Sequence, residues 1–154
     1  MRTITLWQPW ASLIDPTWKV IETRGHDHFA HLKGYRVAFH ACQQFDLDAQ
    51  EEVCAALGIP PKRMMEMLLG NPDIEILPGL TLRRLAQPKA WPRQCILTTA
   101  TVEDTRWLTE ADTRNALCRT DASRFGLVLT DIRRLDRPVL CAGHQGVWDW
   151  KDGR

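Results

Sequence analysis

LWQPWASLI at residues 6–14 and KVIETR at residues 19–24 are the two segments that say most about how this chain folds. Threonine and apolar residues alternate before them, which predicts a short opening strand over residues 1–7. Pro9 ends that strand, because proline cannot donate the hydrogen bond that a central strand requires. Trp10 and the apolar residues after it lie at helical spacing, so a short helix is expected in the second half of the first segment.

The rest of the chain contains several short apolar runs and few helical patterns. The KVIETR segment is rich in β-branched residues and predicts a strand over residues 18–24. Further strands are expected at residues 35–41, 95–102, 125–129, 139–140 and 147–148. Helical patterns lie at residues 46–57 and 62–69, whereas residues 71–92 contain four prolines. We therefore expect an α+β fold, favouring a small barrel, with a helical and irregular insertion at about 46–93.

Length and composition are typical of one globular domain covering residues 1–154. The net charge of +1 lacks the basic excess that broad binding to duplex nucleic acid favours. No apolar stretch could span a bilayer and no signal peptide is visible, so we expect a cytoplasmic protein without a membrane partner. The five cysteines form no C-x-x-C pair, and His26, His28 and His31 match no zinc pattern, so we predict no metal site and no cofactor.

Three blocks together resemble the ASCH family: residues 6–14, residues 19–24 and GHQGVW at residues 143–148. The segment 35–40 is similar to the strand that follows the Lys-x-x-Glu-x-Arg block of that family. The blocks agree in order and spacing over the first 45 residues and from about residue 94 onward, about two thirds of the chain. The resemblance implies a PUA-like fold, a small β-barrel with peripheral helices closing a cleft. It also implies a role in RNA binding, RNA processing or the handling of modified nucleosides.

Alternation along the second segment places Glu22 and Arg24 on one strand face and Thr23 on the other, with Lys19 at the beginning of the strand. Arginine offers a planar fork for phosphate and lysine a compact charge, while glutamate can accept from an exocyclic amine or carry a proton. The three side chains therefore suit a nucleotide. The alternative is an exposed ion-pair cluster, which would contribute little to stability.

Trp7, Gln8 and Trp10 lie where the opening strand meets the short helix, and they can point into the same cleft. An aromatic face and an amide edge both read bases well. Gln8 is the stronger candidate for ligand contact, because the helical spacing of Trp10 also fits a core position. His40 can reach the cleft as a hydrogen-bond partner or proton carrier, or it can be a satisfied, partly buried histidine.

Three functions remain open at this point. The first is binding of single-stranded RNA or a nucleotide, and the second is hydrolysis of RNA or a modified nucleoside with Lys19 and Glu22 as catalytic residues. The third is a protein-interaction domain with a vestigial cleft. Short family members that remove an acetyl group from modified cytidine use a lysine, a threonine three residues later and a distant glutamate. Here Glu22 occupies the position of that threonine, so this particular activity is not expected.

Overall fold

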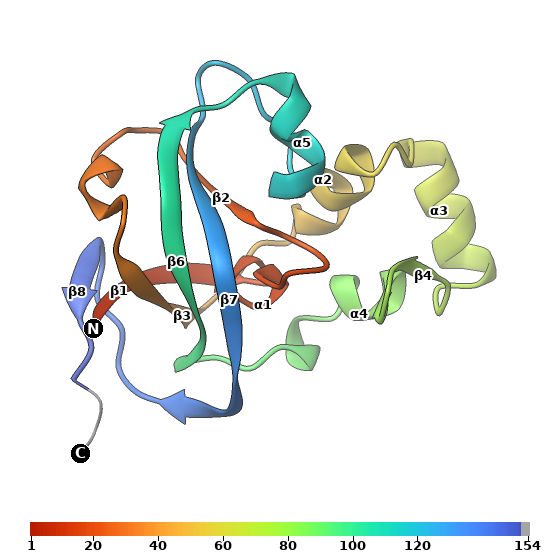
Figure 1. Cartoon of the computed structure of the whole chain (residues 1–154). Helices are drawn as coiled ribbons and strands as arrows, with labels where there is room; N and C mark the ends of the chain where they lie inside the picture. The colour runs from red at the N-terminus through yellow and green to blue at the C-terminus, as the bar shows by residue number, and fades with distance from the viewer. Residues whose placement is uncertain (152–154) are drawn as a thin grey trace.

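The strands form one mixed six-stranded sheet and a separate two-stranded hairpin in the computed structural model, which describes residues 1–151 (Figure 1). The main sheet has the strand order β2-β7-β6-β3-β1-β8. Its strands are β1 Arg2–Gln8, β2 Ile21–Arg24, β3 Arg36–Phe45, β6 Cys95–Trp107, β7 Phe125–Leu140 and β8 Val147–Asp149. β1 and β3 run parallel, and the other neighbouring pairs are antiparallel. The predicted α+β class is confirmed.

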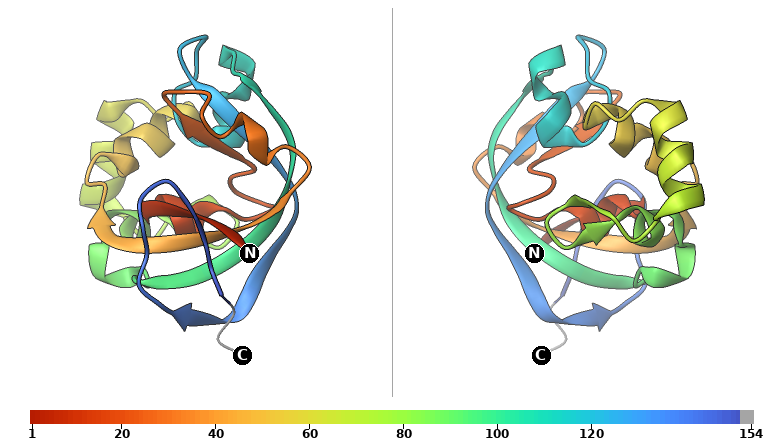
Figure 2. Two further views of the ribbon diagram at one scale, coloured as in Figure 1. Left: turned by 90° about the vertical axis from the view of Figure 1, so that its left-hand side faces the viewer. Right: turned by 90° about the vertical axis from the view of Figure 1, so that its right-hand side faces the viewer.

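Irregular pairing bends the main sheet. The register shifts once between β1 and β3, once between β3 and β6, and at three points between β6 and β7. Such irregularities increase the local twist of a strand. The sheet curves around a common interior (Figure 2), but within residues 1–151 its edge strands β2 and β8 do not pair with each other. A closed barrel is therefore not confirmed, and the observed sheet is open and curved.

β6 and β7 are longer than the sequence pattern predicted. The strands expected at 95–102 and 125–129 continue to Trp107 and Leu140. Their added residues are exposed or half-buried. Pairing with the neighbouring strand, and not burial of one face, holds these residues extended. Because these added residues show no alternation of buried and exposed positions, the hydrophobic pattern of the sequence could not predict where β6 and β7 end.

Residues 46–93 extend to one side of the main sheet (Figure 1). Their elements are α2 Ala49–Ala56, α3 Pro61–Gly70, β4 Glu75–Leu77, β5 Leu80–Thr81, α4 Leu82–Ala86 and η2 Pro88–Ala90. Pro61 begins α3, where the missing N–H of proline removes no helical hydrogen bond. Trp18 anchors the hairpin, because its buried indole Nε1 donates to the Pro78 carbonyl at 2.7 Å.

The remaining helical elements are short: α1 Trp10–Leu13, η1 Ala30–Leu32, η3 Glu110–Asp112 and α5 Thr113–Ala116. α1 follows β1 directly through a cis Gln8–Pro9 peptide bond. The segment before β2 is held against α5, since the Val20 N–H donates to the Asn115 carbonyl at 2.9 Å. These contacts bring the end of β1, β2 and the loop after α5 together.

The main core lies on the inner face of the curved sheet. It includes the buried residues Ile4, Leu6, Val37, Phe39, Leu97, Ala100, Leu127 and Leu129. Burial of such apolar side chains is the main force that stabilises the sheet. Among the described residues, no helix has both the length and the apolar character that crossing a membrane requires.

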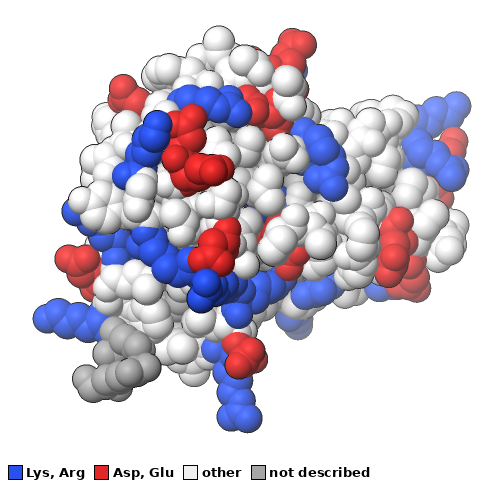
Figure 3. Space-filling model, viewed as in Figure 1, with Lys and Arg blue, Asp and Glu red and all other residues white. Residues whose placement is uncertain are grey.

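Basic side chains form a band across the face of the molecule shown in Figure 3. Ion pairs with carboxylates occur at several arginines of the main sheet: Arg36 and Arg133 both pair with Asp131, at 2.7 and 2.9 Å, and Arg134 pairs with Asp15 at 3.3 Å. Neighbouring carboxylates therefore compensate these arginines. The cavities beside β1 and β2 have a different charge pattern and give the stronger candidate site.

Candidate functional site

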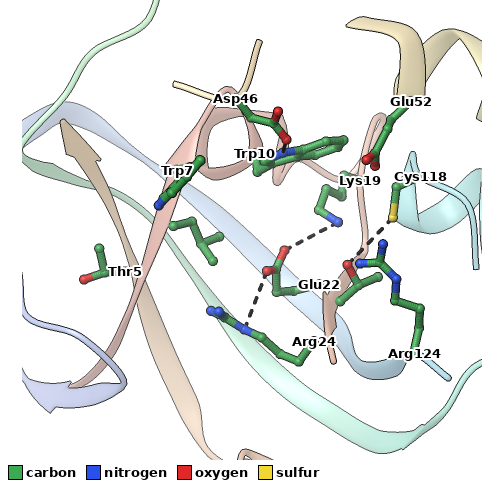
Figure 4. Close-up of a pocket in the computed structure, with 12 residues that line it drawn as sticks. Thr5, Trp7, Trp10, Lys19, Glu22, Arg24, Asp46, Glu52, Cys118 and Arg124 are labelled. Carbon is green, nitrogen blue, oxygen red and sulfur yellow. Dashed lines mark hydrogen bonds and ion pairs between the residues drawn. The ribbon is translucent and has the colours of Figure 1, made fainter. Parts of the chain in front are cut away.

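A cavity of about 310 Å³ lies between β1, α1, β2, α2 and the loop before β7 (Figure 4). We call it the first cavity. Its charged lining residues are three cations and three carboxylates: Lys19, Arg24, Arg124, Glu22, Asp46 and Glu52. Its other lining residues are Thr5, Leu6, Trp7, Trp10, Thr23 and Cys118. Opposite charges are thus balanced, so the first cavity suits a ligand with polar edges and an aromatic face.

The ammonium group of Lys19 is buried and surrounded by acceptors. Nζ donates to the carbonyls of Ile21 at 2.6 Å and Ala116 at 2.8 Å, and Glu22 Oε2 lies 3.4 Å away. Lysine has three protons to donate, and these three acceptors can take all of them. The side chain is 1% exposed. Lys19 therefore ties β2 to α5, and this arrangement leaves no proton of the ammonium for a substrate phosphate.

The guanidinium of Arg24, unlike the ammonium of Lys19, lacks hydrogen-bond acceptors in the described part of the chain. Its Nε and Nη2 atoms are buried and have no hydrogen-bond partner within residues 1–151. Glu22 Oε1, the nearby carboxylate oxygen, is 3.8 Å from Nε, which is beyond hydrogen-bond distance. The guanidinium lies over the Phe29 ring at 4.7 Å from its centroid, which holds its plane in place. The fork is thus positioned and still needs an acceptor.

Two tryptophans border the first cavity, as predicted for the start of the chain. Trp7 is 54% exposed, whereas Trp10 is half-buried and its indole Nε1 donates to Asp46 Oδ2 at 2.8 Å. Figure 4 shows the guanidinium of Arg24 pointing toward the side of the cavity where Thr5 and Trp7 lie. The exposed indole and the free guanidinium therefore lie at the same side of the cavity.

Gln8 does not line the cavity, which corrects the prediction that it is the stronger candidate for ligand contact. Its side chain is fully buried, and its amide donates to Ser12 Oγ and to the Pro92 carbonyl. Its Oε1 accepts from the Ser12 N–H at 3.1 Å. The buried amide thus holds the β1–α1 junction against the segment before β6, and the residue beyond it, Trp10, reaches the cavity instead.

Thr23 also departs from the predicted alternation, because it lines the same cavity as Glu22 and Arg24. Its hydroxyl lies 3.7 Å from the Cys118 thiol. β2 is an edge strand that pairs with β7 alone within the described sheet. Its unpaired side borders the cavity, and residues of both faces can be reached from there.

His40 lies on β3, outside the first cavity, and lines a second, neighbouring cavity. It is 1% exposed, and its Nε2 donates to the Cys141 carbonyl at 3.1 Å, while Nδ1 lies 3.4 Å from the Thr5 hydroxyl. Burial lowers the pKa of the imidazole. These two contacts satisfy the donor and the acceptor of a neutral imidazole, so His40 is better suited to forming a wall of the second cavity than to carrying a proton.

The sequence patterns did not single out Asp46, Glu52, Cys118 or Arg124 as site residues. The acidic start of the predicted 46–57 helix was the available signal for the first two, but it also suits an ordinary helix N-terminus. Burial, followed by the neighbouring charge of Asp46, raises the pKa of Glu52. Arg124 comes from a loop whose position depends on the whole fold, and nothing in its sequence context marks it.

The histidine-containing segment at residues 26–31 lies beside the second cavity. The rings of His26 and His28 stack with centroids 4.2 Å apart. Across residues 1–151, no three histidine, cysteine or acidic side chains are arranged to hold a metal ion. The chain matches no protein-family model, and no curated protein is significantly similar to it.

Proposed function

We propose that this chain is a divergent ASCH protein with a PUA-like architecture and that it binds a nucleotide or a single-stranded RNA segment in the first cavity. The support from sequence is the pair of blocks at residues 6–14 and 19–24. The support from structure is that these blocks supply two aromatic rings, the guanidinium of Arg24 and the Glu22 carboxylate to one cavity.

Arg24 carries this proposal. The Arg24 side chain is 22% exposed, but its Nε and Nη2 atoms are buried without an acceptor among the described residues, which is costly because these N–H groups have lost water and gained no protein partner. A phosphate oxygen would satisfy Nε and Nη2 together, since the planar fork matches phosphate geometry. Glu22, only 5% exposed, keeps the local charge balanced when no phosphate is bound.

The other lining groups suit the rest of a nucleotide. An exposed indole such as Trp7 offers a face on which any base can stack, at about 1–3 kcal/mol per base. Carboxylates accept from exocyclic amines or ribose hydroxyls, and the cavity provides three of them. The near-neutral charge of the cavity and of the chain favours a local contact with one or two nucleotides over broad electrostatic binding.

The test is an equilibrium binding titration of labelled single-stranded RNA against the wild type, Arg24→Gln and a matched control, Arg133→Gln. Both variants lose one positive charge, but Arg133 lies outside the first cavity and pairs with Asp131. We expect Arg24→Gln to weaken binding about tenfold or more and to reduce the salt slope by about 0.7, the value for one phosphate of a single strand. Equal weakening in both variants would show that binding is not centred on Arg24.

Hydrolysis of RNA or a modified nucleoside is a second candidate, favoured by one observation. Glu52 lines the first cavity, and its pKa is raised by burial and then by Asp46, which makes this carboxyl a candidate proton carrier. RNA cleavage by the wild type that disappears in Glu52→Gln would assign an enzyme. RNA retention without cleavage would leave a binding protein.

A further inference from the structure

We propose that the second cavity is a subsite for the adjoining nucleotide, so that the natural ligand is a single-stranded RNA of at least two nucleotides whose linking phosphate binds Arg24. This inference rests on the proposed function, because it extends the same binding site. It is carried by the geometry shared by the two cavities and by their contrasting charge.

The two cavities are neighbours that share three lining residues. The second cavity, of about 710 Å³, is lined by the loop after β2, the second half of β3 and the loop before β8. Thr5, Trp7 and Arg24 line both cavities. A ligand that fills the first cavity and continues past the indole of Trp7 therefore enters the second cavity beside the free guanidinium.

The charge pattern distinguishes the two cavities. The first has three lining carboxylates, whereas the described lining of the second has none. Four imidazoles and four side-chain amides surround the second cavity, and Arg24 is the one permanent charge in its lining as described over residues 1–151. Carboxylates repel phosphate, so the linking phosphate and the following nucleotide are better accommodated on the second side.

The polar groups of the second cavity suit a base and a ribose. Gln43, Gln44 and Gln145 are exposed, and each amide offers both donors and an acceptor. Such groups can pair with the edges of an unstacked base or with a 2′-hydroxyl, which is how proteins read single-stranded RNA. The rings of His26 and Phe29 add aromatic surface at the same wall.

One wall of the second cavity is fixed by close packing. A Cβ at Gly143 would overlap the His40 imidazole, so this glycine allows the loop 143–146 to lie directly against the ring. His40 is held in turn by Thr5 and Cys141, and Trp148 Nε1 donates to the Thr5 hydroxyl at 3.0 Å. The wall is therefore built before any ligand arrives, which reduces the entropy lost on binding.

The experiment compares the affinity for a 5′-mononucleotide with that for a dinucleotide of the same base. The variant is the double substitution Gln43→Glu and Gln44→Glu, which places two carboxylates in the second cavity. The matched control is Asn71→Asp and Asn115→Asp, two exposed amides outside both cavities. Both double variants add the same charge, and circular dichroism confirms that each is folded.

In the wild type and the control, the dinucleotide should bind about tenfold more tightly than the mononucleotide, the gain expected from one additional stacked base. In the glutamate variant, this ratio should fall to about one. A wild-type ratio near one, or a ratio that survives the glutamates, would overturn the subsite while leaving the proposed function intact. If neither probe binds the wild type, the proposed function itself fails and the subsite falls with it.

Discussion

Replacing Lys19 with methionine should destabilise the protein strongly, because the ammonium is a structural cation. Methionine keeps much of the side-chain length but removes every donor. The Ile21 and Ala116 carbonyls, which accept at 2.6 and 2.8 Å, would lose their partner in a buried environment. Glu22, with 7% of its side chain exposed, would keep only the more distant Arg24 nearby, at 3.8 Å.

The magnitude follows from these losses. Removing one member of a buried ion pair typically costs about 3–5 kcal/mol, because the remaining charge is left uncompensated. We therefore expect Lys19→Met to lower the free energy of unfolding by about that amount. Adding Glu22→Gln removes the stranded charge, so the double variant should be destabilised by about 1–2 kcal/mol less than the sum of the single variants.

Urea unfolding followed by circular dichroism measures both quantities through the transition midpoint and slope. A Lys19→Met variant within about 1 kcal/mol of the wild type would refute the structural role, since substitutions without such contacts usually change stability by less than that. The result also affects how activity data are interpreted. Loss of RNA binding or cleavage in a lysine variant would report unfolding unless the variant is shown to be folded.

Two further predictions concern pH and electrostatics. Burial lowers the pKa of His40, so the imidazole binds a proton more readily in the unfolded state than in the folded state. The contribution of His40 to the free energy of unfolding should therefore be fully present above pH 6.5 and should decline as the pH falls below it. This decline should be smaller in His40→Gln. Thermal unfolding between pH 5.5 and 7.5 checks this, and equal slopes in both proteins would contradict it. Hydrogen bonds from Arg106 lower the pKa of Asp112 from 3.8 to about 2, so its stabilisation is present above pH 3.8 and is lost as the pH falls toward 2. Asp112→Asn should therefore cost about 1–2 kcal/mol at pH 7 by urea unfolding, whereas Asp136→Asn, an exposed carboxylate, should cost less than about 0.5 kcal/mol.

Local patterns predicted the parts of the site that are close together in sequence. The alternation of Glu22 and Arg24 and the position of Trp7 before Pro9 are local, and all three lining residues were predicted from them. Gln8 could not be assigned in the same way, because its burial depends on the Pro92 carbonyl, 84 residues away. Glu52 and Arg124 reach the cavity only through tertiary packing.

Features of the fold that depend on long-range contacts were also not predictable from local sequence patterns. The mixed α+β character follows from several short apolar runs, but the full lengths of β6 and β7 depend on how the two strands pair. The open edges likewise depend on long-range pairing, since β2 ends its sheet beside β7, about 100 residues later in the chain.

The pairing of β1 with β8 has a consequence for biosynthesis. β1 is synthesised long before β8, so β1 gains its second neighbour only when residues 147–149 emerge. The Trp150 N–H then donates to the Met1 carbonyl at 2.8 Å. Contacts of such long sequence separation form late. Residues 143–146 can settle against His40 only at that stage. During translation the chain would therefore complete the pocket around Arg24 and Trp10 before the neighbouring one.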